Sequence, residues 1–586
     1  MTGRHSFRFL ARALLIVVLA RGAVASASSP LPARPAGGVV GHGPGTCDDA
    51  ALTAALAGGG TITFNCGGPA TILVTSAKTI SASTTLLGGG VITLTGGSAT
   101  RLFNVDSDVT LDLQHIVLDH AASTGSGGGA IANSGALVLD SVTIQNSHTD
   151  ASNSGGAISS VGPVTVNNSR FLSNTASNGG ALYAFSGLAT VDIRNSTFTN
   201  NQTFTTSNGL GGAIWLGNGA RLTVTDGQIF ENVGNYGGAL YQSPSTDITL
   251  TSELDLEFVG NTARRSGGAI YNEGGTLRVL NASLIGNVTP FTTTVGVGLG
   301  AGIASFGPLA LSGDQIIGNS GSRGGGVYVS STVTSIYISI DRTNLIGNYA
   351  ATRDGGGLFI GGQNAVATIV DSAFTGNVAQ GRGAGLYRDG AYLTINRSSF
   401  SGNVAFATGA GLYLTGPTPS TGEAVLLRDT TINANTNVPS TTTGAGIENL
   451  AQAQLTNVTL KDNSGGLLTG VSATTTLANT VLDNKIANCS GDLPVDNLGN
   501  FATNISSCGF APNEIGHAAK LGPESFDPHG LTAFYLPQPG SPLIGAAISA
   551  CSPRDQRRAL RPAACDTGAV QHDGLLPWLY LALVER

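Results

Sequence analysis

The densest group of carboxylates that could do chemistry lies early in the chain, in the stretch FNVDSDVTLDLQHIVLDH. Asp106, Asp108 and Asp112 stand there at alternate positions, and Gln114 continues the alternation. Residues two apart on a strand point to the same face, so one strand face could present these oxygens together. Clustered carboxylates bind Ca²⁺, and paired carboxylates hydrolyse glycosidic bonds. A solvated outer face is the alternative, which the sequence favours because neighbouring segments offer few further acids.

Four arginines form a second candidate group. Arg265, Arg323, Arg353 and Arg382 each stand one or two residues before a G-[GA]-[AG] sequence. If these segments stack, the guanidinium groups form a basic stripe, and guanidinium forks bind carboxylate or phosphate. The stripe is therefore a candidate binding line for an anionic polysaccharide of the cell envelope or the extracellular space. The alternatives are solvated turn residues and neutralisation by acids such as Asp354.

Composition and charge narrow the function classes. The chain has 85 glycines in 586 residues, 41% hydrophobic residues and only 11% charged residues, which is typical of short strands and turns rather than disorder. The net charge is −7. Without a net-basic surface to neutralise phosphates, nucleic acid is excluded as a partner. The eight histidines form no metal-spaced cluster and no cysteines have C-x-x-C spacing, so we expect no cofactor.

A repeated sequence must supply the elements that position these side chains. FTGNVAQGRGAGLY at Phe374 and FSGNVAFATGAGLY at Phe400 begin 26 residues apart. The closing motif, G-[GA]-[AG]-[ILV], recurs at gaps of 24 to 35 residues and begins at Gly128, Gly155, Gly179, Gly211, Gly237, Gly267, Gly300, Gly324, Gly355, Gly383, Gly409 and Gly444. The opening motif, an apolar residue followed three residues later by Asn, ends at Asn174, Asn201, Asn232, Asn261, Asn287, Asn319, Asn348, Asn377, Asn403, Asn435 and Asn463.

Between the motifs the apolar residues alternate, as in half-buried strands. In TVDIRNSTF, for example, Val191, Ile193 and Phe198 would share one face. One repeat cannot bury its apolar face alone, but stacked repeats share a core. The sequence therefore predicts an all-β chain: a right-handed parallel β-helix with one coil per repeat. In that stack the phenylalanines should lie above one another inside, and the asparagines should bond to one another along a turn.

Both ends carry features expected of caps. CDDAALTAALAGG predicts a short helix, since Asp48 and Asp49 suit its N-terminus while Leu52 and Leu56 share a face. An exported chain with six cysteines favours disulfides, and 15 pairings are open. The cysteines fall into three local couples, which we expect to be the bonds: Cys47–Cys66, Cys489–Cys508 and Cys551–Cys565.

The first residues predict export. Three arginines precede the apolar run ALLIVVLA, and ASA at 25–27 offers small residues for cleavage. Cleavage there would remove four arginines and no acid, which changes the net charge from −7 to −11. Arg21 ends the apolar run far short of the ~20 residues that span a bilayer, and the tail LLPWLYLALVER is also too short. We expect an extracellular or cell-surface protein with no transmembrane segment in the mature chain.

The paired motifs carry a family resemblance. G-G-A-[IL] with F-x-x-N resembles the repeat of polymorphic outer-membrane proteins, within the pectin-lyase-like β-helix superfamily, from about Gly128 to Asn463. NTVLDN, NCSGD, PGSPLIGAA and DQRRALRPAACDTGA, between Asn479 and Ala569, resemble the closing module of choice-of-anchor Q secreted proteins, although Arg558 stands where that family has Gly. The resemblance implies an exported bacterial β-helix of surface or adhesin type.

These observations predict five segments: a signal peptide at 1–27, an N-terminal cap at 28–57, the β-helix at 58–485, a disulfide-bearing capping module at 486–572 and an apolar tail at 573–586. The favoured function is non-catalytic: adhesion or glycan binding along a rigid face. The alternative is a polysaccharide lyase or glycoside hydrolase.

Overall fold

The computed structural model describes residues 37–205, 208–291, 297–331, 335–416, 424–439, 444–503, 507–510, 515–527, 531–548 and 551–574. The chain divides into a unit of residues 1–35 and a unit of residues 36–586, and only the second is described below. The predicted signal peptide and most of the predicted tail lie outside the described residues. Among the described helices, none is long and apolar enough to cross a bilayer.

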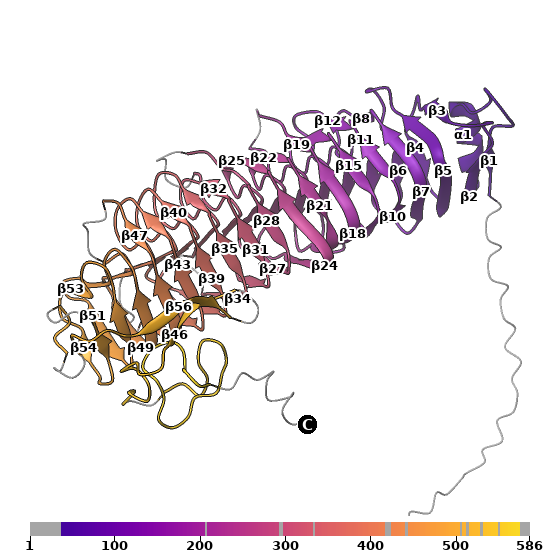
Figure 1. The fold of residues 1–586 in the computed structure, drawn as a ribbon. Helices are drawn as coiled ribbons and strands as arrows, with labels where there is room; N and C mark the ends of the chain where they lie inside the picture. The colour runs from indigo at the N-terminus through magenta and orange to yellow at the C-terminus, as the bar shows by residue number, and fades with distance from the viewer. Residues whose placement is uncertain are drawn as a thin grey trace, which may run out of the picture. The chain divides into compact units, whose positions relative to one another are not determined.

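The second unit is a parallel β-solenoid whose coils follow one another in chain order, from indigo to orange in Figure 1. One face is a 16-stranded sheet. Its strands are β4 (Lys78–Ile80), β6 (Phe103–Val105), β9 (Ile131–Asn133), β13 (Ile158–Ser160), β17 (Leu182–Phe185), β20 (Ile214–Gly217), β23 (Leu240–Gln242), β26 (Ile270–Asn272), β29 (Ile303–Ser305), β33 (Val327–Ser330), β37 (Leu358–Gly361), β41 (Leu386–Asp389), β45 (Leu412–Thr415), β48 (Ile447–Asn449), β50 (Leu467–Thr469) and β53 (Cys489–Gly491).

A 28-stranded sheet wraps around most of the remaining perimeter. In some coils one long bent strand makes this sheet: β5 (Thr84–Thr95), β7 (Thr110–Asp119), β18 (Thr190–Thr199), β21 (Arg221–Phe230), β24 (Asp247–Val259), β46 (Val425–Asn433) and β49 (Gln452–Lys461). In others it is divided into shorter strands: β1 (Val39–Val40), β2 (Gly60–Phe64), β3 (Ala70–Leu73), β10 (Ala136–Asp140), β11 (Thr143–Gln145), β14 (Val164–Asn167), β15 (Arg170–Leu172), β27 (Thr276–Leu280), β28 (Ser283–Ile285), β30 (Leu309–Ser312), β31 (Gln315–Ile317), β34 (Ile336–Asp341), β35 (Asn344–Ile346), β38 (Ala365–Val370), β39 (Ala373–Thr375), β42 (Tyr392–Asn396), β43 (Ser399–Ser401), β51 (Thr474–Ala478), β52 (Val481–Asp483), β54 (Val495–Asp496) and β55 (Phe501–Ala502).

Short strands form two further sheets of six and five strands, one strand in each of eleven coils. They are β8 (Ala122–Ser123), β12 (His148–Thr149), β16 (Thr175–Ala176), β19 (Gln202–Thr203), β22 (Val233–Tyr236) and β25 (Thr262–Ser266), then β32 (Ser320–Gly321), β36 (Tyr349–Ala350), β40 (Val378–Ala379), β44 (Val404–Ala405) and β47 (Thr436–Asn437). The predicted all-β parallel helix is therefore confirmed.

The repeat motifs occupy the predicted places. Phe171 stacks on Phe198 with ring centroids 4.5 Å apart, and both rings are fully buried. Asn377 donates its side-chain N–H to Oδ1 of Asn403 in the next coil at 3.1 Å, and its backbone N–H donates to the same oxygen at 3.0 Å. Equivalent side-chain bonds run from Asn174 to Asn488 along one turn of the solenoid.

The glycine that opens each G-[GA]-[AG] motif makes a left-handed turn. Gly383 has φ +60°, and a Cβ there would come 2.5 Å from the carbonyl oxygen of Leu386. Only glycine adopts this conformation without strain or collision, which explains why the motif recurs at the same point of each coil.

At the N-terminal end, helix α1 (Asp49–Leu56) is capped by Asp48, whose carboxylate accepts the N–H of Ala51 at 2.8 Å. Leu52 is fully buried against the first coil. All three expected disulfides are present: Cys47–Cys66, Cys489–Cys508 and Cys551–Cys565.

The C-terminal residues do two things. Cys489, Cys508 and Phe510 join the main core, so residues 507–510 close the last coil. Residues 515–527, 531–548 and 551–574, which include the hairpin β56 (Leu521–Phe526) and β57 (Ala533–Pro537), fold back along the outer face of the 28-stranded sheet (yellow in Figure 1). The N–H of Ala533 donates to the Ser399 hydroxyl of β43 at 3.0 Å.

Candidate functional site: an aromatic and arginine ridge

An aromatic ladder runs along the outer face of the 16-stranded sheet. Nine rings from nine successive coils contact one another in turn: Tyr183, Trp215, Tyr241, Tyr271, Phe306, Tyr328, Phe359, Tyr387 and Tyr413. The centroids of Tyr183 and Trp215 lie 4.4 Å apart, and those of Tyr387 and Tyr413 lie 5.0 Å apart. The ladder ends at Glu448, which pairs in register with Tyr413.

The sequence predicts this ladder through a position of the repeat that the two motifs leave out. Eight of the nine aromatic residues occupy the fifth position of the glycine motif, as in GGAIW and GAGLY, and only Phe306 is displaced, since Ala304 takes that position in its coil. The fourth position points into the core, so the fifth points outward because strand residues alternate. Leu386 is accordingly fully buried, and Tyr387 beside it is half-buried on the outside.

Stacking determines what the ladder can contact. Each interior ring has a neighbouring ring on both sides, so the ladder presents mainly ring edges and tyrosine hydroxyls to solvent. Burial raises the pKa of Tyr241, Tyr271 and Tyr387 above the ordinary tyrosine value, which keeps their hydroxyls protonated. At the end of the ladder, burial also raises the pKa of Glu448. The ladder is thus a neutral hydrogen-bonding support for the charged groups beside it.

The four predicted arginines lie beside the glycine turns, but they occupy two positions rather than one. Arg323 and Arg382 directly precede their glycines, whereas Arg265 and Arg353 stand one residue earlier. Arg323, Asp354 and Arg382 follow one another on three successive coils, since each carbonyl accepts an N–H of the preceding coil's glycine turn. We call the aromatic ladder together with these four arginines and Asp354 the ridge.

Three of the arginines lie against aromatic rings. The guanidinium carbon of Arg323 is 4.8 Å from the ring centroid of Phe359, and that of Arg382 is 5.1 Å from Tyr413. Arg265 lies 5.6 Å from the centroid of Tyr236 and donates to its hydroxyl at 2.8 Å. Cation–π contacts of this kind hold a guanidinium in place without neutralising it.

Asp354 places a negative charge between two arginines of the ridge. Its carboxylate accepts a hydrogen bond from the Arg323 guanidinium at 3.0 Å and one from the backbone N–H of Arg382 at 3.0 Å. Arg382 and Arg265 are exposed, and Arg353 is half-buried. The predicted neutralisation therefore falls on Arg323, whereas the guanidinium of Arg382 has no carboxylate within 4.0 Å among the described residues.

A cavity of about 420 Å³ opens where the ridge meets the turn after β37. Arg323, Tyr328, Phe359 and Asp389 line it, together with the amide side chains of Gln363 and Asn364. A guanidinium, a carboxylate, two amides and two ring edges make a lining that can hydrogen-bond to hydroxyl and carboxylate groups.

The three carboxylates near the N-terminus do not share one strand face, which was the weaker of the two interpretations. Strand β6 ends at Val105 and β7 begins at Thr110, so a turn separates Asp106 and Asp108 from Asp112. Asp108 has φ +65° within that turn, and Asp112 instead accepts a hydrogen bond from Gln114 at 2.9 Å. Within the described ranges, no group of three or more His, Cys, Asp or Glu residues is placed to hold a metal ion.

Two family models match parts of the chain. Residues 311–486 match the family described as right handed beta helix region, and residues 255–273 match the Chlamydia polymorphic membrane protein repeat. No curated protein matches the chain. A crystal structure of tailspike protein 3 of bacteriophage CBA120 aligns at 11% identity and a TM-score of 0.20, over 84% of this chain and 65% of that one, which is less than two thirds of the tailspike's length.

The fold and the family matches define the class of this protein: it is a right-handed parallel β-helix. Within that class, it carries at least one repeat similar to that of the polymorphic membrane proteins, at residues 255–273, where β24 leads into β25 and the 16-stranded sheet.

Proposed function

We propose that the chain is an exported, non-catalytic β-helical protein that binds acidic glycans along the ridge. The observation that carries the proposal is the set of guanidinium groups held against aromatic rings beside one row of glycine turns. Single exposed charges bind weakly, but charges fixed along a line bind a polyanion multivalently. The ring contacts hold Arg265, Arg323 and Arg382 in place, so little side-chain entropy is lost on binding. Of the three, Arg323 is also paired with Asp354.

A cell-surface location and an adhesive role belong to the same proposal. The matched repeat is named for membrane proteins of Chlamydia, and the sequence begins with an export-type segment. We further propose that residues 479–569 are a closing module of the choice-of-anchor Q type. Hydrogen bonds from Ala533, Tyr535 and Gln556 to the solenoid support a module that folds with the coils.

A binding role is favoured over lyase or hydrolase chemistry by the surroundings of the buried acids. Burial raises the pKa of Asp314 to about 7, but its carboxylate accepts the backbone N–H groups of Ala282 and Ser312 in the wall of a coil. Burial also raises the pKa of Asp429, which nonetheless pairs with Arg561 at 3.1 Å. These two carboxyl groups therefore serve internal contacts of the solenoid.

The test replaces all four ridge arginines, Arg265, Arg323, Arg353 and Arg382, by Ser. Binding to an acidic polysaccharide such as polygalacturonate should fall at least about tenfold, and wild-type binding should weaken with added salt. A matched variant replaces four exposed arginines elsewhere on the solenoid, Arg170, Arg194, Arg221 and Arg278, and has the same net charge. An equal loss of binding in both variants would mean that binding depends on the net charge of the protein and not on the ridge. Turnover of the polysaccharide, seen as new reducing ends or unsaturated products, would overturn the non-catalytic assignment.

A further inference from the structure

A second cavity lies on the other large sheet, between the solenoid and the C-terminal segment. Its volume is about 620 Å³, within the range typical of small-molecule sites, ~300–1,000 Å³. One wall is the outer face of the 28-stranded sheet, where Asn396, Arg428 and Thr456 form a cross-strand row in register on β42, β46 and β49. The other wall is the segment Cys551–Arg554.

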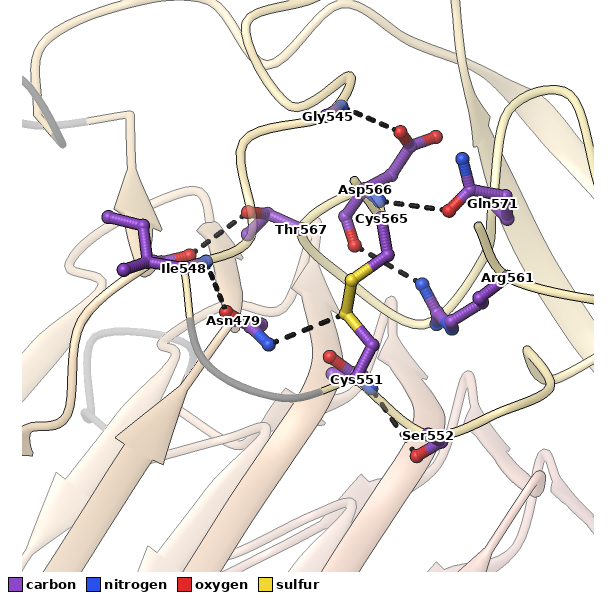
Figure 2. The surroundings of a disulfide bond; sticks show 12 residues. Asn479, Gly545, Ile548, Cys551, Ser552, Arg561, Cys565, Asp566, Thr567 and Gln571 are labelled. Carbon is purple, nitrogen blue, oxygen red and sulfur yellow. Dashed lines mark hydrogen bonds between the residues drawn. A yellow bond between two sulfur atoms is a disulfide. The ribbon is translucent and has the colours of Figure 1, made fainter. Parts of the chain in front are cut away.

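The second wall is firmly held. The Cys551–Cys565 disulfide ties it to the turn at Asp566, as Figure 2 shows. The Asp566 carboxylate accepts the N–H of Gly545 at 2.8 Å, and the backbone N–H of Asp566 donates to Gln571 at 2.9 Å. Asn479 links this turn back to the solenoid, since its carbonyl accepts the N–H of Gly568 at 2.8 Å. The cavity is therefore preformed between two packed elements.

Some charged side chains around the cavity have an oppositely charged partner, and others have none among the described residues. Arg397 is paired with Asp371, whose carboxylate accepts two hydrogen bonds from it at 2.7 and 3.0 Å and a further one from Arg558. Asp429 is neutralised by Arg561, and the side chains of this pair are only 3% and 1% exposed.

Two lining arginines lack such a partner. Arg428 and Arg554 are both exposed, and among the described residues neither has a carboxylate within 4.0 Å. The cavity thus carries two uncompensated guanidinium groups, and bringing a carboxylate to them gains charge-assisted hydrogen bonds without breaking an existing ion pair.

We infer that this cavity binds an acidic sugar, with its carboxylate at Arg428 and Arg554. The rest of the lining supplies neutral hydrogen-bonding groups: the amides of Asn396, Gln454 and Asn497 and the hydroxyls of Thr456 and Ser552. Amides and hydroxyls match the hydroxyl groups of a sugar ring, whereas a bare inorganic anion would use only the arginines. The site is separate from the ridge, which lies on the 16-stranded sheet.

The experiment measures binding of a galacturonate trimer, free galacturonate, a neutral galactose trimer and inorganic sulfate by calorimetry at low salt. The double variant Arg428→Ser/Arg554→Ser should bind the acidic trimer or the free acid at least about tenfold more weakly than wild type, a loss of about 1.4 kcal/mol. Binding of the free acid would assign the cavity to a monosaccharide, and binding of the trimer alone would assign it to a polymer. The neutral trimer should show no comparable binding.

Two controls keep this test independent of the ridge. The four-arginine ridge variant should keep its affinity for the short acidic ligands, so failure of the ridge proposal leaves this one intact. Arg278→Ser removes another exposed arginine of the same sheet and should change nothing. Unchanged binding by the double variant, equal binding of the neutral trimer, or sulfate binding more tightly than the uronic acid would each overturn the assignment.

Discussion

The ring of Phe374 lies on the ring of Phe400, the equivalent residue of the next coil, with centroids 4.5 Å apart and planes inclined by 11°. Both rings are fully buried, and their strands pair in parallel with these two residues in register. The spacing of strands, about 4.8 Å, is close to the separation of stacked rings, so the same residue at the same point of each coil stacks on itself. The repetition in the sequence is the signature of this stack.

Replacing Phe374 by Ala should remove one ring from the stack and leave a cavity. We expect a local loss of roughly 3–5 kcal/mol, because the ring is fully buried and its neighbours in adjacent coils cannot collapse into the space. Protease cleavage or hydrogen exchange in the middle coils should increase. The control is Phe406→Ala, since Phe406 is 46% exposed and its loss should leave no cavity. Equal protection in the two variants would contradict the stack.

Local repetition made the fold predictable. The alternation of apolar residues placed Val191 and Ile193 in the core, and the regular Asn positions predicted the buried ladder that includes Asn377. The disulfides were predictable because each joins cysteines fewer than 20 residues apart. In each case the interacting residues are close in the sequence or occupy the same position of a repeat.

The residues of the proposed binding surfaces are brought together by turn geometry and by contacts between distant parts of the chain. Whether an arginine one or two residues before a glycine joins the same row depends on backbone geometry at the turn, which a motif does not specify. The contacts of the C-terminal segment link residues far apart, such as Arg558 with Asp371, 187 residues earlier. No local pattern marks such a pair. The aromatic ladder is different, because eight of its nine residues occupy one position of the repeat, directly after the glycine motif.

A buried acid predicts an unusual pH dependence. Burial raises the pKa of Asp314 to about 7, whereas an unfolded aspartate titrates near 3.9. Between those values the folded state holds a proton that the unfolded state has lost, so unfolding free energy should fall as pH rises from about 4 to 7. The decrease amounts to about 4 kcal/mol at most.

The comparison that isolates this effect is Asp314→Ser. Ser372, two coils on, accepts the N–H of Thr343 at 3.1 Å, so a serine hydroxyl can make the bond that Asp314 makes to Ala282. Thermal unfolding at pH 5 and pH 8 should show the wild type losing more stability than the variant between the two conditions. Parallel pH profiles would mean that Asp314 titrates normally.

Arg558 combines a costly backbone conformation with an ion pair. Its φ is +67°, in the left-handed region, and its guanidinium donates to the Asp371 carboxylate at 2.5 Å. Arg558→Gly and Arg558→Ala both remove the ion pair, but only Gly also removes the backbone cost, so the Ala variant should be less stable by about 1 kcal/mol. Urea unfolding of the two variants measures this difference. An Ala variant as stable as the Gly variant would show that the backbone at 558 relaxes.

The carboxylate of Asp354 should limit the affinity of the ridge for polyanions. It stands between Arg323 and Arg382 on successive coils and neutralises the first of them. Asp354→Asn keeps an oxygen that can accept the N–H of Arg382 and removes one negative charge from the row. Binding of an acidic polysaccharide should therefore tighten severalfold and depend more steeply on salt.

Asp247→Asn is the matched control for this gain, because Asp247 is an exposed acid 3.9 Å from Arg221, away from the ridge. It makes the same change in net charge and should leave binding almost unaltered. Titrations at low and moderate salt, with wild type beside both variants, give the affinities and their salt slopes. If Asp354→Asn binds no better than Asp247→Asn, the row formed by Arg323, Asp354 and Arg382 is not where the polyanion lies, and the exposed Arg265 becomes the next residue to test.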